Sequence, residues 1–298
     1  MQRALGRFLN HLNVERGFSP ATVAAYRLDL EKGFVPFLGR RDKNRYHDVT
    51  KEDVRAYLDY LAHARGNSSA ARARKLSAIR SLFNYLVENE GLPNNPAASI
   101  RSPKIAEKEP CYLTDEECFL LLDAVSRRAS PRNRKRDMAI VMLFLHTGAR
   151  VSELVNLKLN DVDLASGFIR ITRKRNKEQH LHLNAEAVKA LAKYKSARLK
   201  AQDGRFFVTG QGKDLNRAFV YALVRKYLEL AEIRKDKKGP HLLRHTFCTR
   251  LHRKGVTPFV IRDLAGHKSL ATTMRYVNIE KKEQAEAVDK LVFGLAKV

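Results

Sequence analysis

The chain of 298 residues carries 57 Lys and Arg against 32 Asp and Glu, which gives a formal net charge of +25. A surface this basic attracts polyanions, so nucleic acid is the expected partner. The hydrophobic fraction of 44% and the charged fraction of 30% exclude a disordered chain, and the length predicts two domains or one large one.

No segment of the sequence is typical of membrane insertion, secretion or metal binding. The longest apolar run, from Met138 to Leu145, is too short to span a bilayer, and the first residues lack an apolar signal core. The three cysteines form no CxxC pair, which argues against a disulfide framework or a zinc ribbon. We therefore expect a soluble cytoplasmic protein that needs no metal and no cofactor.

Four helices are predicted in the first hundred residues. Apolar residues at helical spacing mark the first over residues 3–14, and Ser19 followed by proline opens the second. A capping box from Thr50 to Asp53 begins the third. The fourth carries apolar residues between 76 and 86, and the turn from Gly91 to Pro96 ends it.

The fourth helix opens with a cluster of basic residues. No acidic residue lies between Arg65 and Arg80, so the cluster is either a solvated face or a contact for DNA phosphates. The single sign of charge favours phosphate contact. Residues 1–98 are therefore predicted to form a helical DNA-binding domain.

A linker is predicted over residues 99–112, followed by a second domain over 113–298. A capping box from Thr114 to Glu117 begins this domain. The dense basic run from Arg127 to Arg136 is read as a loop that is either solvated or in contact with DNA. A tail helix is predicted at about 281–296.

Alternating side chains at 167–172 and 179–183 predict two antiparallel strands, and 205–208 is a candidate short third strand. The basic turn at 173–178 makes a hairpin tip able to reach a DNA groove. The fold class is thus mainly α in two domains, the second a mixed α+β domain with a small antiparallel sheet. The residues expected to contact DNA are Arg72, Arg74, Lys75, Arg80, Arg173 and Arg175.

Two segments far apart in the sequence carry the candidate chemistry. Arg150 and Glu153 share a helical face, either as a surface ion pair or as an arginine that its carboxylate orients. His241 and Arg244 likewise share a helical face with His245.

The second segment continues past this helix. His267 follows Gly266 in a turn, and Tyr276 ends the short helix that comes next. Because His267 precedes that helix, the turn allows the two side chains to approach.

This set of residues suits attack on a phosphodiester. Two arginine forks match the non-bridging oxygens of the transition state. A tyrosine hydroxyl with a pKa near 10 needs nearby cations or a histidine base to act as a nucleophile. A lysine at the hairpin tip would protonate the leaving oxygen. The tyrosyl phosphodiester conserves bond energy, so no nucleotide is required.

The ordered motifs resemble those of the tyrosine recombinases, in particular the Xer-type recombinases and phage integrases. The motifs are Thr147-Gly-Ala-Arg-Val-Ser-Glu153, His241-Leu-Leu-Arg-His245 and Leu264-Ala-Gly-His267 with Thr272-Thr-Met-Arg-Tyr276. Ser19-Pro-Ala-Thr22 also resembles the family's N-terminal core-binding, SAM-like domain. The similarity extends over nearly the full chain.

The resemblance implies a role for each matching residue. Arg150 and Arg244 would clamp the scissile phosphate, with Glu153 in support. His241 would act as base or hydrogen-bond partner, and His267 would bond a phosphate oxygen.

Two further roles follow from the same resemblance. Tyr276 would form a 3′-phosphotyrosine. In place of the family's Gly-Lys-Gly turn the chain has Arg173-Lys174-Arg175, which leaves Lys174 as the general acid and Lys177 as the lesser candidate.

The function implied is site-specific recombination of double-stranded DNA. A homo- or hetero-tetramer would form on the recombination site, pass through a Holliday junction and exchange tail helices between protomers, in a prokaryotic cytoplasm at the nucleoid. Two alternatives remain: a non-catalytic DNA-binding protein of the same fold, and a relaxing enzyme similar to type IB topoisomerases.

Overall fold

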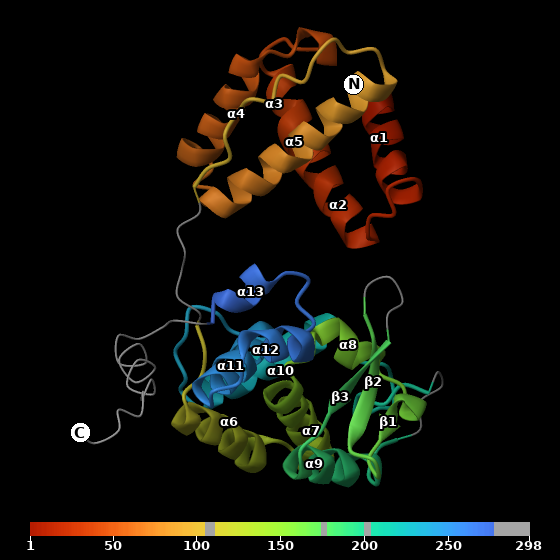
Figure 1. The fold of residues 1–298 in the computed structure, drawn as a ribbon, viewed down its shortest axis with the longest axis vertical. Coiled ribbons are helices and arrows are strands. Elements are labelled where there is room, and N and C mark those ends of the chain that lie inside the picture. Colours follow the sequence, from red (N-terminus) through yellow and green to blue (C-terminus); the bar gives the residue numbers. More distant parts are fainter. Residues whose placement is uncertain (105–110, 174–177, 200–203, 277–298) are drawn as a thin grey trace, which may run out of the picture. The chain divides into compact units, whose positions relative to one another are not determined.

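The computed structural model describes residues 1–104, 111–173, 178–199 and 204–276, and the chain divides into two compact units at residue 107 (Figure 1). Both units are mainly helical, and the second adds a small antiparallel sheet, which confirms the predicted fold class. None of the described helices is long and apolar enough to cross a bilayer. The predictions that lie outside the described residues concern Lys174, Arg175, Lys177 and the tail helix at about 281–296.

The first unit is built around its longest helix, α5, which packs against α1, α2 and α4. Its core is apolar and continuous, from the buried face of α1 to the turn after α5. In chain order its elements are α1 (Gln2–Val14), α2 (Pro20–Asp29), the π-helical η1 (Leu30–Phe34), α3 (Val35–Gly39), the 3₁₀ turn η2 (Tyr46–Asp48), α4 (Lys51–His63) and α5 (Ser69–Asn89).

The predicted helix starts in this unit are confirmed. The hydroxyl of Ser19 accepts a hydrogen bond from the backbone of Thr22, and Thr50 and Asp53 form the capping box that begins α4. The segment after α2 was not predicted. It continues from α2 without a break as η1 and α3, because fully buried apolar side chains from 30 to 38 hold it against the core.

The basic cluster on α5 is engaged within its own unit. Arg74 and Lys75 both pair with the carboxylate of Asp29, which is only 2% exposed. Arg72 donates to the carbonyl oxygen of Asn67, just before the helix, and Arg80 donates to that of Ala97, in the segment after it. These residues therefore tie α5 to α2 and to the segment after the helix, whatever else they contact.

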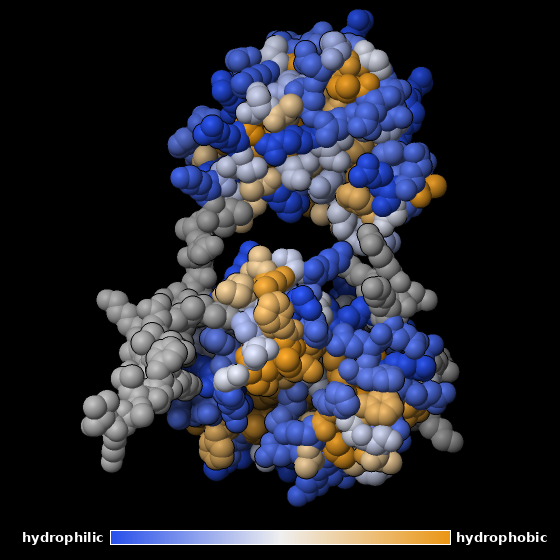
Figure 2. All heavy atoms as spheres, in the orientation of Figure 1, coloured by the Kyte–Doolittle hydropathy of each residue, from blue (hydrophilic) through white to orange (hydrophobic). Residues whose placement is uncertain are grey.

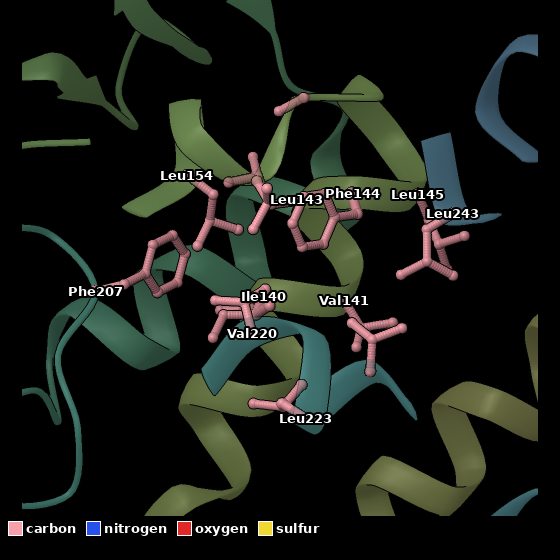
Figure 3. Packing of buried hydrophobic residues seen from close by; sticks show 14 of the residues in the cluster. Ile140, Val141, Leu143, Phe144, Leu145, Leu154, Phe207, Val220, Leu223 and Leu243 are labelled. Carbon is pink, nitrogen blue, oxygen red and sulfur yellow. The ribbon is translucent and has the colours of Figure 1, made fainter. Parts of the chain in front are cut away.

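The second unit is built around α7, which packs against α6, α9 and α11. Figure 3 shows Ile140 and Phe144 of α7 among side chains from α8, α10 and α11. In chain order its elements are α6 (Asp115–Arg128), α7 (Pro131–Thr147), α8 (Val151–Asn156), the 3₁₀ turn η3 (Leu159–Asp161), β1 (Val162–Asp163), β2 (Phe168–Thr172), β3 (Glu178–His182), α9 (Ala185–Lys195), α10 (Arg217–Leu230), α11 (Pro240–Arg253), α12 (Pro258–Ala265) and α13 (Leu270–Met274).

The basic run from Arg127 to Arg136 is not a loop, because it consists of the end of α6 and the start of α7 with only Ala129 and Ser130 between them. Pro131 occupies the first turn of α7, where its missing N–H costs nothing, so the helix begins inside the run. Arg136 is 5% exposed, and its Nε donates to Asp137 Oδ1 over 2.8 Å. At least this arginine is structural.

The sheet has the order β1-β2-β3 and is antiparallel throughout. Ile169 of β2 faces Leu181 of β3, and both side chains are buried, as their alternation predicts. The predicted third strand at 205–208 is wrong, because its ends form isolated bridges and β1 takes that place. Phe206 and Phe207 are buried in succession, so this segment lacks the alternation of a strand.

Candidate active site

The first part of the site is the opening turn of α11. Pro240 begins the helix, and Leu242 and Leu243 are buried in the core, which directs the opposite face to the site. Arg244 on that face is 6% exposed. Its Nη1 donates to the carbonyl oxygen of Gly148, and its Nη2 donates to that of Ala265 over 2.6 Å.

Arg150 enters the site from the start of α8. Gly148 ends α7 in the left-handed region with φ 59°, where an added Cβ would overlap the ring of Phe247. Arg150 is the N-cap of α8, and its Nη1 donates to Glu153 Oε1 over 2.8 Å. Glu153 is buried at 7% exposure, so the carboxylate orients the arginine and the pair is not a surface ion pair.

The turn between α12 and α13 supplies the remaining groups. Gly266 ends α12 with φ 64°, and its carbonyl oxygen accepts from Arg150 Nη2 over 2.6 Å. His267 follows, and its Nδ1 lies 2.8 Å from Thr273 Oγ1. The ring of Tyr276 stacks on that of His267, with centroids 6.0 Å apart. The turn therefore brings the two residues together, as predicted.

Tyr276 is held in a small apolar cluster with Phe247, Cys248 and Ile261. The ring is 7% exposed, and its centroid lies 5.3 Å from that of His245. Burial raises the pKa of Tyr276 to about 12, and the nearby Cys248 adds to the effect. The hydroxyl is thus protonated at neutral pH, and attack requires a base or added positive charge.

Three guanidinium groups meet at the C-terminal end of α12. Besides Arg150 and Arg244, Arg173 donates from Nη1 to the carbonyl oxygen of Ala265 over 2.6 Å and from Nη2 to that of Leu264 over 3.1 Å. The last carbonyls of a helix carry partial negative charge and lack partners within the helix. They hold the three cations in place at this turn.

The histidines of the site are neutral at pH 7. Burial lowers the pKa of His241, and the positive charges of Arg244 and Arg150 lower it further. Burial and neighbouring cations also bring the pKa of His245 and of His267 to about 4. A neutral imidazole can accept a proton or share a hydrogen bond, which suits both roles that the sequence suggested.

These shifts predict a loss of stability in mild acid. Between the unfolded pKa near 6.5 and the folded pKa of about 4, the unfolded chain binds more protons at His245 and His267. The contribution of both residues is complete above pH 6.5 and is lost as the pH falls towards 4. We expect the urea midpoint of the wild type to fall further over this window than that of a double variant with His245→Gln and His267→Gln. If the urea midpoints of the wild type and the double variant fall equally over this window, the lowered pKa values of His245 and His267 are contradicted.

Most of the predicted catalytic residues that the structure describes lie close together. Arg150, Arg244, His267 and Tyr276 are joined by the contacts above, and His241 lies one turn before His245 on α11. Two further residues of the site were not predicted to belong to it. Thr273 has no local signal, and Arg173, expected at a DNA phosphate, turns onto α12. Among the described residues, no group of three His, Cys, Asp or Glu side chains could hold a metal ion.

Comparison with known proteins agrees with this geometry. One family model, the phage integrase family, matches residues 112–283, and another, the phage integrase N-terminal SAM-like domain, matches 5–90. The chain belongs to the phage integrase family. Two similar relatives in this family are named tyrosine recombinase XerC. That of Roseiflexus sp. (strain RS-1) is 33% identical, over 94% of this chain and 90% of the relative. That of Thermodesulfovibrio yellowstonii is 34% identical, over 95% and 94% respectively.

The fold of this integrase-family chain also matches solved structures. XerH site-specific recombinase, in a pre-cleavage complex with its difH substrate, has a TM-score of 0.74 and 24% identity. The match covers 97% of this chain and 88% of that chain. The family models and the relatives confirm the resemblance drawn from the sequence motifs, and the solved structure agrees with the fold.

Proposed function

We propose that this chain is a site-specific DNA recombinase that cuts and rejoins strands through a 3′-phosphotyrosine at Tyr276. The observation that carries the proposal is the packing of the Tyr276 ring against His245 and His267. Guanidinium groups of Arg150 and Arg244 reach the same turn. A nucleophile, oxyanion donors and neutral imidazoles, carried by different elements, thus meet at the turn between α12 and α13.

In the proposed step the Oη of Tyr276 attacks the scissile phosphorus, and its proton passes to His241. The bond between phosphorus and the 5′ oxygen breaks, and the leaving oxygen takes a proton from Lys174, with Lys177 as the second candidate. The new tyrosyl phosphodiester keeps the bond energy. A 5′ hydroxyl from another strand can therefore reverse the step without ATP, and chemistry of this kind requires no metal.

The proposed phosphate clamp uses groups that the fold already orients. Arg150, held by Glu153, and Arg244 would move their donors from backbone carbonyls to the non-bridging oxygens. His267, with Nδ1 beside Thr273, would present Nε2 to a phosphate oxygen. Only the donors turn, because the backbone that carries these groups is already fixed, and such preorganisation is usually the largest source of this kind of catalysis.

We assign DNA binding to residues 1–98 and catalysis to 113–298, joined by the linker at 99–112. On α5, the side chain of Arg74 is 48% exposed even while it pairs with Asp29, which leaves it able to reach a phosphate. The proposed contacts are Arg72, Arg74, Lys75, Arg80 and, in the hairpin, Arg175.

We further propose that four copies, identical or of two kinds, assemble on two recombination sites in a prokaryotic cytoplasm and exchange their tail helices. Support comes from apolar side chains that α12 and α13 leave exposed, namely Phe259, Val260 and Met274. Figure 2 shows the apolar area over these helices. A docked helix would cover such side chains.

The decisive experiment traps the proposed covalent intermediate. The full chain is incubated with nicked duplexes cut from genomic DNA of its source, denatured in detergent, and the attached DNA is sequenced. We expect an adduct enriched in one sequence, with the linked peptide containing Tyr276. If no adduct forms, the proposal is contradicted. Relaxation of supercoiled DNA without preference for a sequence would favour the topoisomerase-like alternative.

A further inference from the structure

Arg173 directly follows β2, and its side chain turns back onto the last turn of α12. Its two terminal nitrogens donate to two successive carbonyl oxygens, those of Leu264 and Ala265. The packing is tight, because a Cβ added at Gly266 would overlap the guanidinium group. This fork-shaped contact joins residues about ninety positions apart in the chain.

The other limb of the hairpin is attached to the same turn. From β3, Gln179 Nε2 donates to the carbonyl oxygen of Asp263 over 2.8 Å. The three successive carbonyl oxygens of residues 263–265 therefore accept hydrogen bonds from both sides of the hairpin. The segment 174–177 connects these two attachment points and contains Lys174 and Lys177.

Placing a third cation here is unfavourable in itself. Burial lowers the pKa of Arg173 to about 10, and the charges of Arg150 and Arg244 oppose it. Its Nε is buried and has no hydrogen-bond partner among the described residues. The contact is retained because the end of α12 supplies acceptors with partial negative charge. Such a costly contact fits a role that depends on the position of this guanidinium group.

We propose that Arg173 is a positioning residue, which clamps the base of the β2–β3 hairpin onto α12 and so fixes the point from which the chain continues to Lys174, the proposed general acid. The inference rests on the proposed recombinase function. It predicts that loss of the clamp impairs protonation of the leaving 5′ oxygen, and leaves binding of the scissile phosphate unaffected. A direct phosphate contact by Arg173 would impair both.

The test uses two nicked duplexes that differ at the scissile bond. One has the natural 5′ oxygen and the other a bridging 5′ sulfur, which leaves as a thiolate and needs no proton near neutral pH. Arg173→Met keeps the apolar stem and removes the donors. We expect its cleavage rate to fall about tenfold with oxygen and to stay within about twofold of the wild type with sulfur, as for a misplaced general acid.

The matched control is Arg170→Met on β2, three residues before Arg173, where the arginine pairs with Asp161 and Glu178 and not with α12. It should lower neither rate by more than about twofold, since exposed pairs contribute little. Gln179→Leu should repeat the oxygen-specific loss in weaker form. Equal losses on both substrates in Arg173→Met, or no loss on either, would overturn the proposal. A wild-type chain that cleaves neither substrate would instead refute the recombinase function.

Discussion

Tyr276→Phe abolishes the detergent-resistant protein–DNA adduct and leaves DNA binding intact. The substitution removes the Oη that would bond to phosphorus, while the ring keeps its contacts with Phe247 and Ile261. With this hydroxyl removed, adduct formation should drop by about 10³-fold or more. The measurement is the yield of adduct on nicked duplex after denaturation, beside a gel-shift titration for binding.

The matched control is Tyr112→Phe in the same unit. The ring of Tyr112 lies under the guanidinium group of Arg253, 4.9 Å away, and this contact does not involve the hydroxyl. This variant should form adduct at the wild-type rate. An adduct that persists in Tyr276→Phe would show that another residue is the nucleophile.

Arg244→Lys is expected to slow cleavage by about 10²–10³-fold, the usual cost of losing one oxyanion donor. Lysine keeps the charge, but a single ammonium cannot donate to Gly148 and Ala265 at the same time and then turn to two phosphate oxygens. The single-turnover rate of adduct formation on nicked duplex measures the effect. The variant should also be about 1–3 kcal/mol less stable, because a buried carbonyl loses its donor.

Arg250→Lys provides the comparison on the same helix. Arg250 is 33% exposed and pairs with Asp115 at the surface, so its replacement should change the cleavage rate by less than about twofold. If Arg244→Lys cleaves as fast as Arg250→Lys, the guanidinium fork has no special part in the reaction.

Local signals in the sequence were sufficient for many features. Helix starts at Ser19, Thr50 and Thr114 were predicted because a cap needs only residues three positions apart. The turn at Gly266 was predicted from the glycine alone, and with it the approach of His267 to Tyr276. Such signals do not depend on distant parts of the chain.

Features that depend on distant partners were missed. The segment 205–208 looks like a strand by composition, but its successive buried aromatic rings pack on Tyr194 instead of forming a ladder. The basic run that begins at Arg127 looks solvated, yet Arg136 lies over the ring of Phe219 at 4.9 Å. In both cases tertiary packing outweighed the local pattern.

The sequence by itself determined the helical class and the caps, since both follow from short spacings. It also determined the ordered set of nucleophile, histidines and arginines, since each motif that carries them is short. Only the tertiary structure decided which cations enter the site. Arg74 pairs with Asp29, whereas Arg173, similar in sequence context, joins Arg150 and Arg244 at the end of α12. The reason is physical: a guanidinium group goes where acceptors are available, and the acceptors for Arg173 come from carbonyls about ninety residues away.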